Sequence, residues 1–485
     1  MKKNNAHNPA SPTVFSPRFL WLILIGCVLM LLLGLLRSPH RDEPVSNATS
    51  ADTTTTEASA VSTGAERTRW LPRRTGTAPT LTAEEIVAGK LLQFTRSRRE
   101  LARLMAKRKG AAMPDEVERF FDALESGKWE EIERQWKVLS KKSRQYDDST
   151  DADSPKLDPV WNAVLDAYGA AEQVHEWPAQ KLLDYGNAIL DSLRPGMVYV
   201  GGTDEGRWVP TLLNETTGGE SHIIVTQNAM ADGRYVEYMN TLYGDRIATL
   251  TEEDSQRAFR DYVADAQRRL EHDEQFPDEP KQIRFGEDVK VVDGKVQVSG
   301  QIAVMSINEK LLQALMAKNP DLDFAVQESS PLRGTYADAR PLGPLMELGA
   351  RDEQNAFTPE RATQSLDYWR NKTQEVLSDP EAMNSNYALK SYSHNTAAAA
   401  NLLAEHNFTA EAEETYRLAA QLWPGSSKSI GGLADLLMRD GRETEARQLV
   451  GEFNQKFPDQ RKDLERISAA ARLILPAGVA PPARR

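Results

Sequence analysis

Apolar residues recur at helical spacing along residues 81–146. Leu91 and Leu101 belong to this pattern, and Thr82 followed by Glu85 is a capping-box signature at the start of the first helix. We therefore predict a segment made of several helices over these residues.

The pattern changes between residues 157 and 349, where short apolar runs are bounded by glycine, proline and polar residues. Such runs predict buried strands, and helical stretches separate them. The order strand, glycine-rich turn, helix, strand is typical of an α/β domain with mostly parallel strands, so the predicted fold class is α/β or α+β. An Asp-Gly pair between two valine-rich runs also predicts a β-hairpin. The predicted strands and hairpin lie at residues 197–200, 222–226, 289–298 and 323–326.

A continuous apolar run without charge extends from Phe19 to Leu36. At about 1.5 Å per residue it reaches roughly 27 Å, which suffices for a hydrocarbon core. Arg18 and Arg37 flank the run, as is typical of a membrane span. We predict a single transmembrane helix at residues 19–36; a cleaved signal peptide is the alternative, although no small-x-small cleavage pattern follows.

Residues 37–80 are polar and rich in serine and threonine, which predicts a flexible linker because they cannot bury enough apolar surface to fold. Basic residues are slightly more numerous before the apolar run than after it, which favours residues 1–18 as a cytoplasmic tail. The expected localisation is therefore a single-pass membrane protein whose body lies outside the cytoplasm, in the periplasm.

A spacing of 34 residues relates two stretches near the C-terminus. Small, large and proline positions match in pairs at this spacing: Leu403 with Leu437, Ala412 with Ala446, Tyr416 with Val450, and Pro424 with Pro458. Small residues suit helix crossings and proline ends a helix, so the pattern resembles the tetratricopeptide repeat. It predicts repeats at 393–426 and 427–460 within a helical domain at 358–475, followed by a disordered tail at 476–485. An ordinary pair of helical hairpins is the alternative.

Repeats of this kind stack into a concave surface that binds other proteins. We therefore expect a partner protein at the C-terminal repeats, with Asn401, Tyr416 and Leu437 as the predicted contact residues.

Composition excludes some functions and leaves others open. The 485 residues carry a formal net charge of -12, which argues against a nucleic-acid partner, since such proteins need a surplus of basic side chains. The single cysteine, Cys27, lies inside the apolar run, so the rest of the chain has no thiolate metal site. We predict no metal and no cofactor.

Polar residues cluster where two predicted strands end. Open α/β sheets bind ligands at the carboxyl ends of their strands, and N–H groups exposed there favour anions. This position predicts a pocket for a small ligand or a nucleotide sugar, with an arginine placed to pair with phosphate or carboxylate. The alternative is that the glycines make a tight turn, the aspartate caps a helix and the arginine pairs with a nearby Glu. The predicted ligand-binding residues are Gly201, Gly202, Thr203, Asp204, Arg207, Gln227 and Asn228.

Catalytic signatures are weaker. The seven histidines show no metalloprotease spacing, and the chain has no Gly-x-Ser-x-Gly elbow. We therefore name no catalytic residue, and whether the protein is an enzyme stays open.

Three stretches resemble the motifs of a family of membrane-tethered bacterial tetratricopeptide-repeat proteins. They run from Tyr168 to Trp177, from Val200 to Arg207 and from Thr226 to Gly233. The same region is distantly similar to the soluble portion of membrane proteins related to protein O-mannosyltransferases. The resemblance implies a fold neighbourhood and brings no established activity. The chain departs from the family pattern near residues 326–336, where Gln327 replaces an acid and most aromatic residues are missing.

These expectations combine into two hypotheses of function. The first is a membrane-anchored, extracytoplasmic interaction or scaffold protein that binds its partner through the C-terminal repeats. The second is a ligand- or nucleotide-sugar-binding domain of a glycan or cell-envelope system, related to glycosyltransferases, that acts through the central domain.

Overall fold

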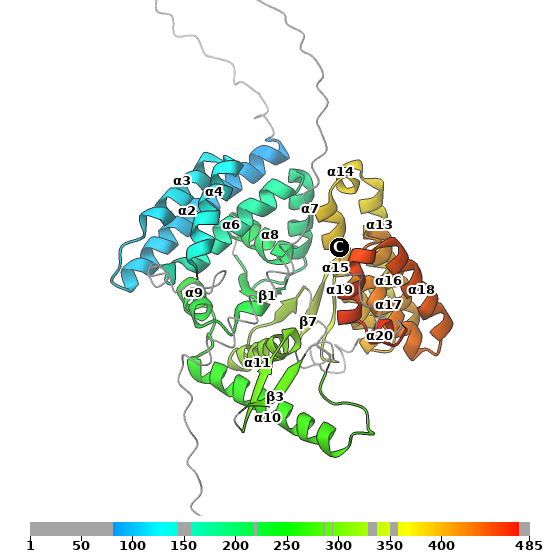
Figure 1. Ribbon diagram of the computed structural model, residues 1–485. Helices are drawn as coiled ribbons and strands as arrows, with labels where there is room; N and C mark the ends of the chain where they lie inside the picture. Colours follow the sequence, from blue (N-terminus) through cyan, green and yellow to red (C-terminus); the bar gives the residue numbers. More distant parts are fainter. Residues whose placement is uncertain are drawn as a thin grey trace, which may run out of the picture.

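The computed structural model describes residues 81–143, 157–202, 204–217, 221–284, 287–292, 294–327, 337–349 and 357–474. The predicted transmembrane helix, linker and C-terminal tail lie outside these ranges, as does Thr203. Within the described ranges no helix is both long and apolar enough to cross a membrane. Figure 1 shows that helices dominate the molecule and that the strands are short.

Helices also dominate the N-terminal part, where α2 packs against both α6 and α7. The predicted capping box is present, because Thr82 Oγ1 accepts a hydrogen bond from the Glu85 N–H at 3.2 Å and a Glu85 carboxylate oxygen accepts one from the Thr82 N–H at 2.9 Å. The helices are α2 (Ala83–Arg108), α3 (Asp115–Ser126), α4 (Trp129–Lys142), α6 (Trp161–Glu176), α7 (Ala179–Leu190) and α8 (Asp204–Glu215).

A five-stranded mixed sheet, with strand order β2-β1-β5-β7-β6, lies at the centre. β1 pairs in parallel with β2 and β5, whereas β7 runs antiparallel to β5 and β6. The strands are β1 (Val198–Gly201), β2 (Ile223–Thr226), β5 (Phe324–Val326), β6 (Arg340–Leu342) and β7 (Leu345–Leu348).

The prediction of an α/β fold with mostly parallel strands is therefore wrong: the molecule is mostly helical and its small sheet is mixed. The reason lies in β6 and β7. The sequence of β7, Leu-Met-Glu-Leu, has no β-branched residue, so its local pattern does not predict a strand. It is extended because it pairs with β5 and is buried along its whole length.

Both faces of the sheet are buried, which explains the continuous apolar runs of β1 and β2. Side chains alternate along β1, so Val198 and Val200 enter one hydrophobic core while Tyr199 enters a second. The first core also holds residues of α3, α4 and α6, and the second holds residues of α2, α7 and α8. The N-terminal helices and the sheet thus share continuous cores.

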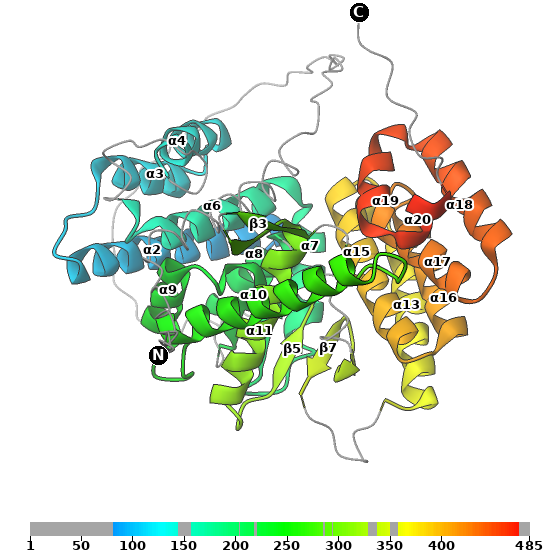
Figure 2. The same cartoon turned by 60° about the horizontal axis from the view of Figure 1, so that its bottom comes forward.

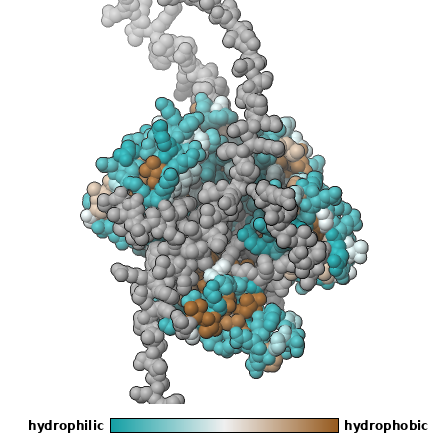
Figure 3. Space-filling model, in the orientation of Figure 1, coloured by the Kyte–Doolittle hydropathy of each residue, from teal (hydrophilic) through white to brown (hydrophobic). Residues whose placement is uncertain are grey.

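The helix α10 and the hairpin of β3 and β4 form a projecting arm at the lower side of the molecule in Figure 1. The predicted β-hairpin is confirmed: β3 and β4 pair antiparallel and turn at Gly294, whose φ is 71°. Figure 3 shows an apolar patch in the area where Figure 1 draws α11 and β3, and Val291 on β3 is 57% exposed. The central helices and the arm comprise η1 (Gln227–Ala229), α9 (Gly233–Tyr243), α10 (Glu252–Gln275), β3 (Asp288–Val292), β4 (Lys295–Ser299) and α11 (Gln301–Lys318).

The C-terminal helices lie on the opposite side from the N-terminal helices in both Figure 1 and Figure 2. Two consecutive helix pairs, α15 with α16 and α17 with α18, occupy the region of the predicted repeats, although α15 begins at Asn386 and not at residue 393. The helices are α13 (Pro359–Ser378), α14 (Pro380–Met383), α15 (Asn386–Glu405), α16 (Thr409–Leu422), α17 (Ser427–Arg439), α18 (Glu443–Lys456), η3 (Pro458–Gln460), α19 (Arg461–Ile467) and α20 (Ala469–Ile474).

Candidate functional site

The carboxyl ends of β1, β2 and β5 meet at one edge of the sheet, because these three strands are parallel. β1 continues through α8 to β2 on one side, whereas β5 lies on the other side of β1. The order in which strands are added to the sheet therefore reverses at β1: β2 is added on one side of it, and β5 is added later on the other side. In open sheets such a switch point is where ligands bind.

Two glycines let α8 approach the strand ends closely. A Cβ atom on Gly201 would lie 2.7 Å from the carbonyl oxygen of Gly206. A Cβ atom on Gly206 would lie 1.5 Å from the side-chain oxygen of Gln327, the residue after β5. Neither position has room for a larger residue, so the glycines bring the first turn of α8 against the ends of β1 and β5.

The two amide residues predicted at the end of β2 are at this edge. The Gln227 side chain is 1% exposed, and its Nε2 atom has no hydrogen-bond partner among the described residues. Asn228 donates a hydrogen bond of 3.4 Å from Nδ2 to the carbonyl oxygen of Gly202, while its buried Oδ1 atom finds no partner in the described part of the chain. Buried amide groups are normally paired, so these atoms mark a place where a ligand or water is needed.

Four carboxylates act on the Tyr387 hydroxyl of α15: Glu172 and Glu176 from α6, and Asp204 and Glu205 from the start of α8. All four lie close enough to the Tyr387 hydroxyl to help raise its pKa to about 12, a shift due first to burial and then to their negative charge. Tyr387 is 41% exposed, so the cluster has one side toward solvent.

The carboxylates differ in their preference for a proton. Burial, and then repulsion from Asp204, raises the pKa of Glu172 to about 7. Burial, and then repulsion from Glu205, raises the pKa of Asp204 to about 6. Burial also acts to raise the pKa of Glu205, but His394, its own backbone N–H and a Ser391 hydroxyl at 3.0 Å outweigh it and lower this pKa. Near neutral pH the site therefore holds partly protonated acids beside an ionised one.

Arg207 does not face this site as a free anion-binding group. Its guanidinium donates a hydrogen bond of 2.8 Å to Asp166, which also accepts one from the Tyr238 hydroxyl. Asp166 lies 3.6 Å from Arg98, and Arg98 forms a two-pronged ion pair with Glu215. The structure thus places Arg207 in a buried network that joins α2, α6, α8 and α9, and its partner is an Asp and not the Glu that the alternative predicted.

The helix α15 completes the site from a distant part of the chain. Ser391 and His394 contact Glu205, with His394 Nδ1 3.8 Å from Glu205 Oε1. The next residue, Asn395, accepts a hydrogen bond of 2.8 Å from Gln327 Nε2. No local pattern in the sequence links Ser391 to Glu205, which lies 186 residues earlier at the start of α8. Glu172 and Glu176 did fall within a motif of the family resemblance, but nothing marked them as site residues.

The residues predicted to contact a partner protein are mostly internal, which corrects that prediction. Tyr416 and Leu437 are buried in the core between α15, α16 and α17, and the Tyr416 hydroxyl donates a hydrogen bond to Asn401. The 34-residue spacing selects the positions where helices touch, and such positions are core positions. α15 is itself buried on most sides, because Tyr392 and Ala398 pack into the two cores of the sheet.

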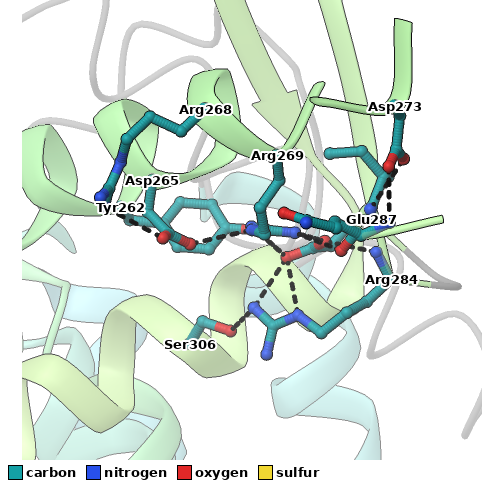
Figure 4. Close-up of polar contacts among 10 residues, drawn as sticks. Tyr262, Asp265, Arg268, Arg269, Asp273, Arg284, Glu287 and Ser306 are labelled. Carbon is teal, nitrogen blue, oxygen red and sulfur yellow. Dashed lines mark hydrogen bonds and ion pairs between the residues drawn. The ribbon is translucent and has the colours of Figure 1, made fainter. Parts of the chain in front are cut away.

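A second polar cluster links α10, the segment between α10 and β3, and α11 (Figure 4). Arg269 and Arg284 both bind Glu287, and Tyr262 donates a hydrogen bond of 2.6 Å to it. Although burial acts to raise the pKa of Glu287, these partners lower it to about 2. Arg284 also donates to Ser306 of α11 at 2.9 Å. Because the carboxylate is fully paired, this cluster fastens α10 and α11 and offers no free binding group.

Comparisons of the chain with family models, curated proteins and solved structures return no match. Within the described ranges no group of three or more His, Cys, Asp or Glu side chains is arranged to hold a metal ion.

Proposed function

We propose that the protein is a ligand-binding protein whose site lies at the carboxyl edge of β1, β2 and β5, beneath α15. The observation that supports this most is the Nε2 atom of the buried Gln227 side chain, which has no hydrogen-bond partner among the described residues, next in sequence to Asn228, whose Oδ1 atom also lacks one there. An unpaired buried polar atom costs roughly 1–3 kcal/mol, and proteins accept such a cost where function requires it. A ligand with hydroxyl or amide groups both accepts and donates hydrogen bonds, so it matches these two side chains.

The negative charge of the four carboxylates affects which ligand the site can bind. A nucleotide sugar brings phosphates, which the carboxylates repel, and the nearest arginine is already engaged by Asp166. The geometry thus favours a sugar or another polar ligand without phosphate over the nucleotide sugar expected from the sequence.

Calorimetric titration of the full chain in detergent micelles tests the proposal with three probes: glucosamine, N-acetylglucosamine and UDP-N-acetylglucosamine. We expect heat of binding for at least one of the two sugars without phosphate. Gln227→Met should abolish that binding, whereas Gln448→Met on the exposed face of α18 should leave it unchanged. Silence from all three probes, with a folded protein, would remove the proposal.

A protein-binding role for the C-terminal helices is the second candidate, supported by the two consecutive helix pairs of α15–α18. Because Tyr416 and Leu437 are buried, a partner has to use other side chains, such as the exposed pair Arg447 and Glu443 of α18. Reversing both charges should change the set of proteins captured from solubilised membranes, and reversing Arg96 on α2 should not. An identical set from both variants argues against docking at α18.

The membrane anchor at residues 19–36 and an extracytoplasmic body complete the proposal. Alkaline phosphatase and, separately, a fluorescent protein active only in the cytoplasm can be fused after Arg485. Phosphatase activity without fluorescence is expected. The reverse result places the body in the cytoplasm, and a mature N-terminus beyond residue 37 identifies a cleaved signal peptide instead.

A further inference from the structure

We propose that His394 is the base of the ligand site: its Nε2 atom takes a proton from a hydroxyl group of the bound ligand, while Glu205 holds the ring through Nδ1. Glu205 is then a positioning residue, because it acts through His394. This inference rests on the proposed ligand-binding function and names the group that acts on the ligand.

Both residues lie at the switch point between β1 and β5. Glu205 is in the first turn of α8, which follows the end of β1. Ser391 of α15 donates a hydrogen bond of 3.0 Å to Glu205 Oε1. His394 precedes Asn395, which accepts a hydrogen bond of 2.8 Å from Gln327, the residue after β5. Two hydrogen bonds therefore hold α15 across the ends of both strands, where open sheets bind ligands.

The two ring nitrogens of His394 have different surroundings. Nδ1 is buried and lies 3.8 Å from Glu205 Oε1, without a hydrogen-bond partner among the described residues. The side chain as a whole is 27% exposed, so the exposed part of the ring lies away from Nδ1. Within the described ranges no side chain or backbone group pairs with Nε2. Nδ1 thus faces the carboxylate, and Nε2 is open to a ligand.

The carboxylate of Glu205 is suited to hold an N–H group. Burial acts to raise its pKa, but His394, the Glu205 backbone N–H and the Ser391 hydroxyl outweigh burial and lower this pKa, so the group is ionised. An ionised carboxylate beside Nδ1 favours the tautomer with the proton on that nitrogen, which leaves Nε2 as an acceptor. The distance of 3.8 Å exceeds a hydrogen bond, as is common for catalytic pairs before the ligand binds.

His272, at the end of α10, is a matched histidine whose two nitrogens both face carboxylates. Its side chain is 26% exposed, and its buried Nδ1 atom lies 3.7 Å from Asp273, so it resembles His394 in both respects. Its Nε2 atom, however, lies 3.2 Å from Glu279. His272 is therefore the natural control for a reaction that needs an open Nε2 atom.

The proposed proton transfer balances in charge. The O–H bond of the ligand breaks, the proton binds to Nε2, and the ring becomes an imidazolium whose charge Glu205 neutralises. The ligand oxygen keeps the electron pair and becomes a nucleophile. A hydroxyl group fits this role, because it carries the proton that Nε2 accepts and has no negative charge for Glu205 to repel.

Diethyl pyrocarbonate measures the reactivity of Nε2 without knowledge of the ligand. Nε2 bonds to a carbonyl carbon of the reagent, the bond from that carbon to the bridging oxygen breaks, ethyl carbonate leaves, and Nδ1 gives its proton to Glu205. The full chain in detergent micelles is treated at pH 8, and mass spectrometry of its peptides gives a rate for each histidine. His394 should react at least about tenfold faster than His272.

Two variants separate the charge of Glu205 from its structural contacts. Glu205→Gln removes the negative charge beside Nδ1 and should slow the reaction of His394 about tenfold, with the rate of His272 unchanged. Ser391→Ala removes one hydrogen bond to the same carboxylate but keeps its charge, so the rate of His394 should stay within about threefold. Circular dichroism checks the folding of both. The comparison of His394 with His272 needs no variant, so it holds even if Glu205→Gln does not fold.

The role of His394 toward the ligand is tested with the phosphate-free sugar that binds in the calorimetric titration. His394→Ala should weaken its binding about three- to tenfold, because the hydroxyl group loses its acceptor. His272→Ala, the matched control, should leave the affinity unchanged.

Equal rates for His394 and His272, or a rate of His394 that Glu205→Gln leaves unchanged, overturn the assignment of His394 as a base held by Glu205. Unchanged sugar binding by His394→Ala overturns its role toward the ligand, while the ligand-binding function stands. Silence from glucosamine, N-acetylglucosamine and UDP-N-acetylglucosamine overturns the proposed function itself. This failure is distinguished from the others because the reaction rates of the two histidines do not depend on a ligand.

Discussion

Two buried glutamines show how pairing decides the role of a residue. Gln227 and Gln327 are each 1% exposed and follow β2 and β5, the two parallel strands that flank β1. Gln327 donates hydrogen bonds to Tyr185 at 2.6 Å and to Asn395 at 2.8 Å, whereas the Nε2 atom of Gln227 lacks a partner among the described residues. Gln327 therefore joins α7, α15 and the sheet. The Nε2 atom of Gln227 remains available to a ligand.

Replacing each glutamine by methionine is expected to have opposite effects on stability. Gln227→Met removes an unpaired buried polar group, so the free energy of unfolding should rise by about 1 kcal/mol. Gln327→Met leaves the Tyr185 and Asn395 groups unpaired, so it should fall by about 1–3 kcal/mol. Chemical denaturation followed by circular dichroism measures both. A loss of stability in Gln227→Met would mean that this side chain is structural.

The pH dependence of stability provides a second test at the residue scale. The pKa of Glu172 is about 7 in the folded protein, above its ordinary value of 4.5, so the folded state binds the proton more tightly than the unfolded state. Stability from this group is therefore present below pH 4.5 and is lost as the pH rises toward 7. Glu172→Gln should be more stable than the unchanged protein at pH 8 and about equal to it at pH 4.

Glu287 supplies the control for this test, because its pKa is shifted in the opposite direction, to about 2. Its contribution is present above pH 4.5 and is lost as the pH falls toward 2. Glu287→Gln should therefore destabilise the protein at pH 8, and the difference should shrink in acid. Denaturation curves at both pH values decide the matter, and the same sign of change for both variants would contradict the assignment.

At the scale of elements, the site depends on the close packing of α6 against α8. A Cβ atom on Gly169 would lie 2.1 Å from the Trp208 ring, which cannot yield easily because it is buried. Gly169→Ala should lower the free energy of unfolding by at least 1–3 kcal/mol and weaken ligand binding, since it separates Glu172 from Asp204.

Gly89 on α2 is the matched glycine for this experiment. It is exposed within a helix, and a Cβ atom there meets nothing within 4 Å. Gly89→Ala should therefore raise the free energy of unfolding by roughly 0.5–1 kcal/mol through helix propensity alone. Thermal unfolding of the two variants should shift in opposite directions, and a shift in the same direction would show that Trp208 moves aside.

At the scale of the whole molecule, α15 makes the sheet and the C-terminal helices one folding unit. Tyr392 and Leu389 pack into a core that also contains Tyr199 of β1, while Leu403 packs with α16 and α17. The C-terminal helices are therefore not a detachable docking module.

Truncation tests this unity. A chain that ends at residue 383 lacks α15 and should show no cooperative thermal transition, because Tyr185 and Gln327 lose their cover. A chain that ends at Lys456 loses η3, α19 and α20, which pack on α17 and α18, and should keep a cooperative transition at a lower temperature. Circular dichroism during heating distinguishes the two. A cooperative transition in the shorter chain would show that the body folds alone.

The sequence by itself determined the features that depend on short stretches of chain. The capping box at Thr82, the buried strands β1, β2 and β5, the hairpin turn at Gly294, and the amides that end β2 all follow from local patterns. Hydrophobic periodicity and turn chemistry act over a few residues, so a single sequence reveals them.

Only the tertiary structure decided the mixed sheet and the composition of the site. β7 has no local strand signal and is extended because it lies against β5. Arg207 was assigned to a ligand because its buried partner, Asp166, lies 41 residues earlier in the sequence. Tyr387 and His394 reach the carboxylates of α6 and α8 through the packing of α15. Contacts between residues so far apart arise from the summed burial of many side chains, and no local pattern encodes them.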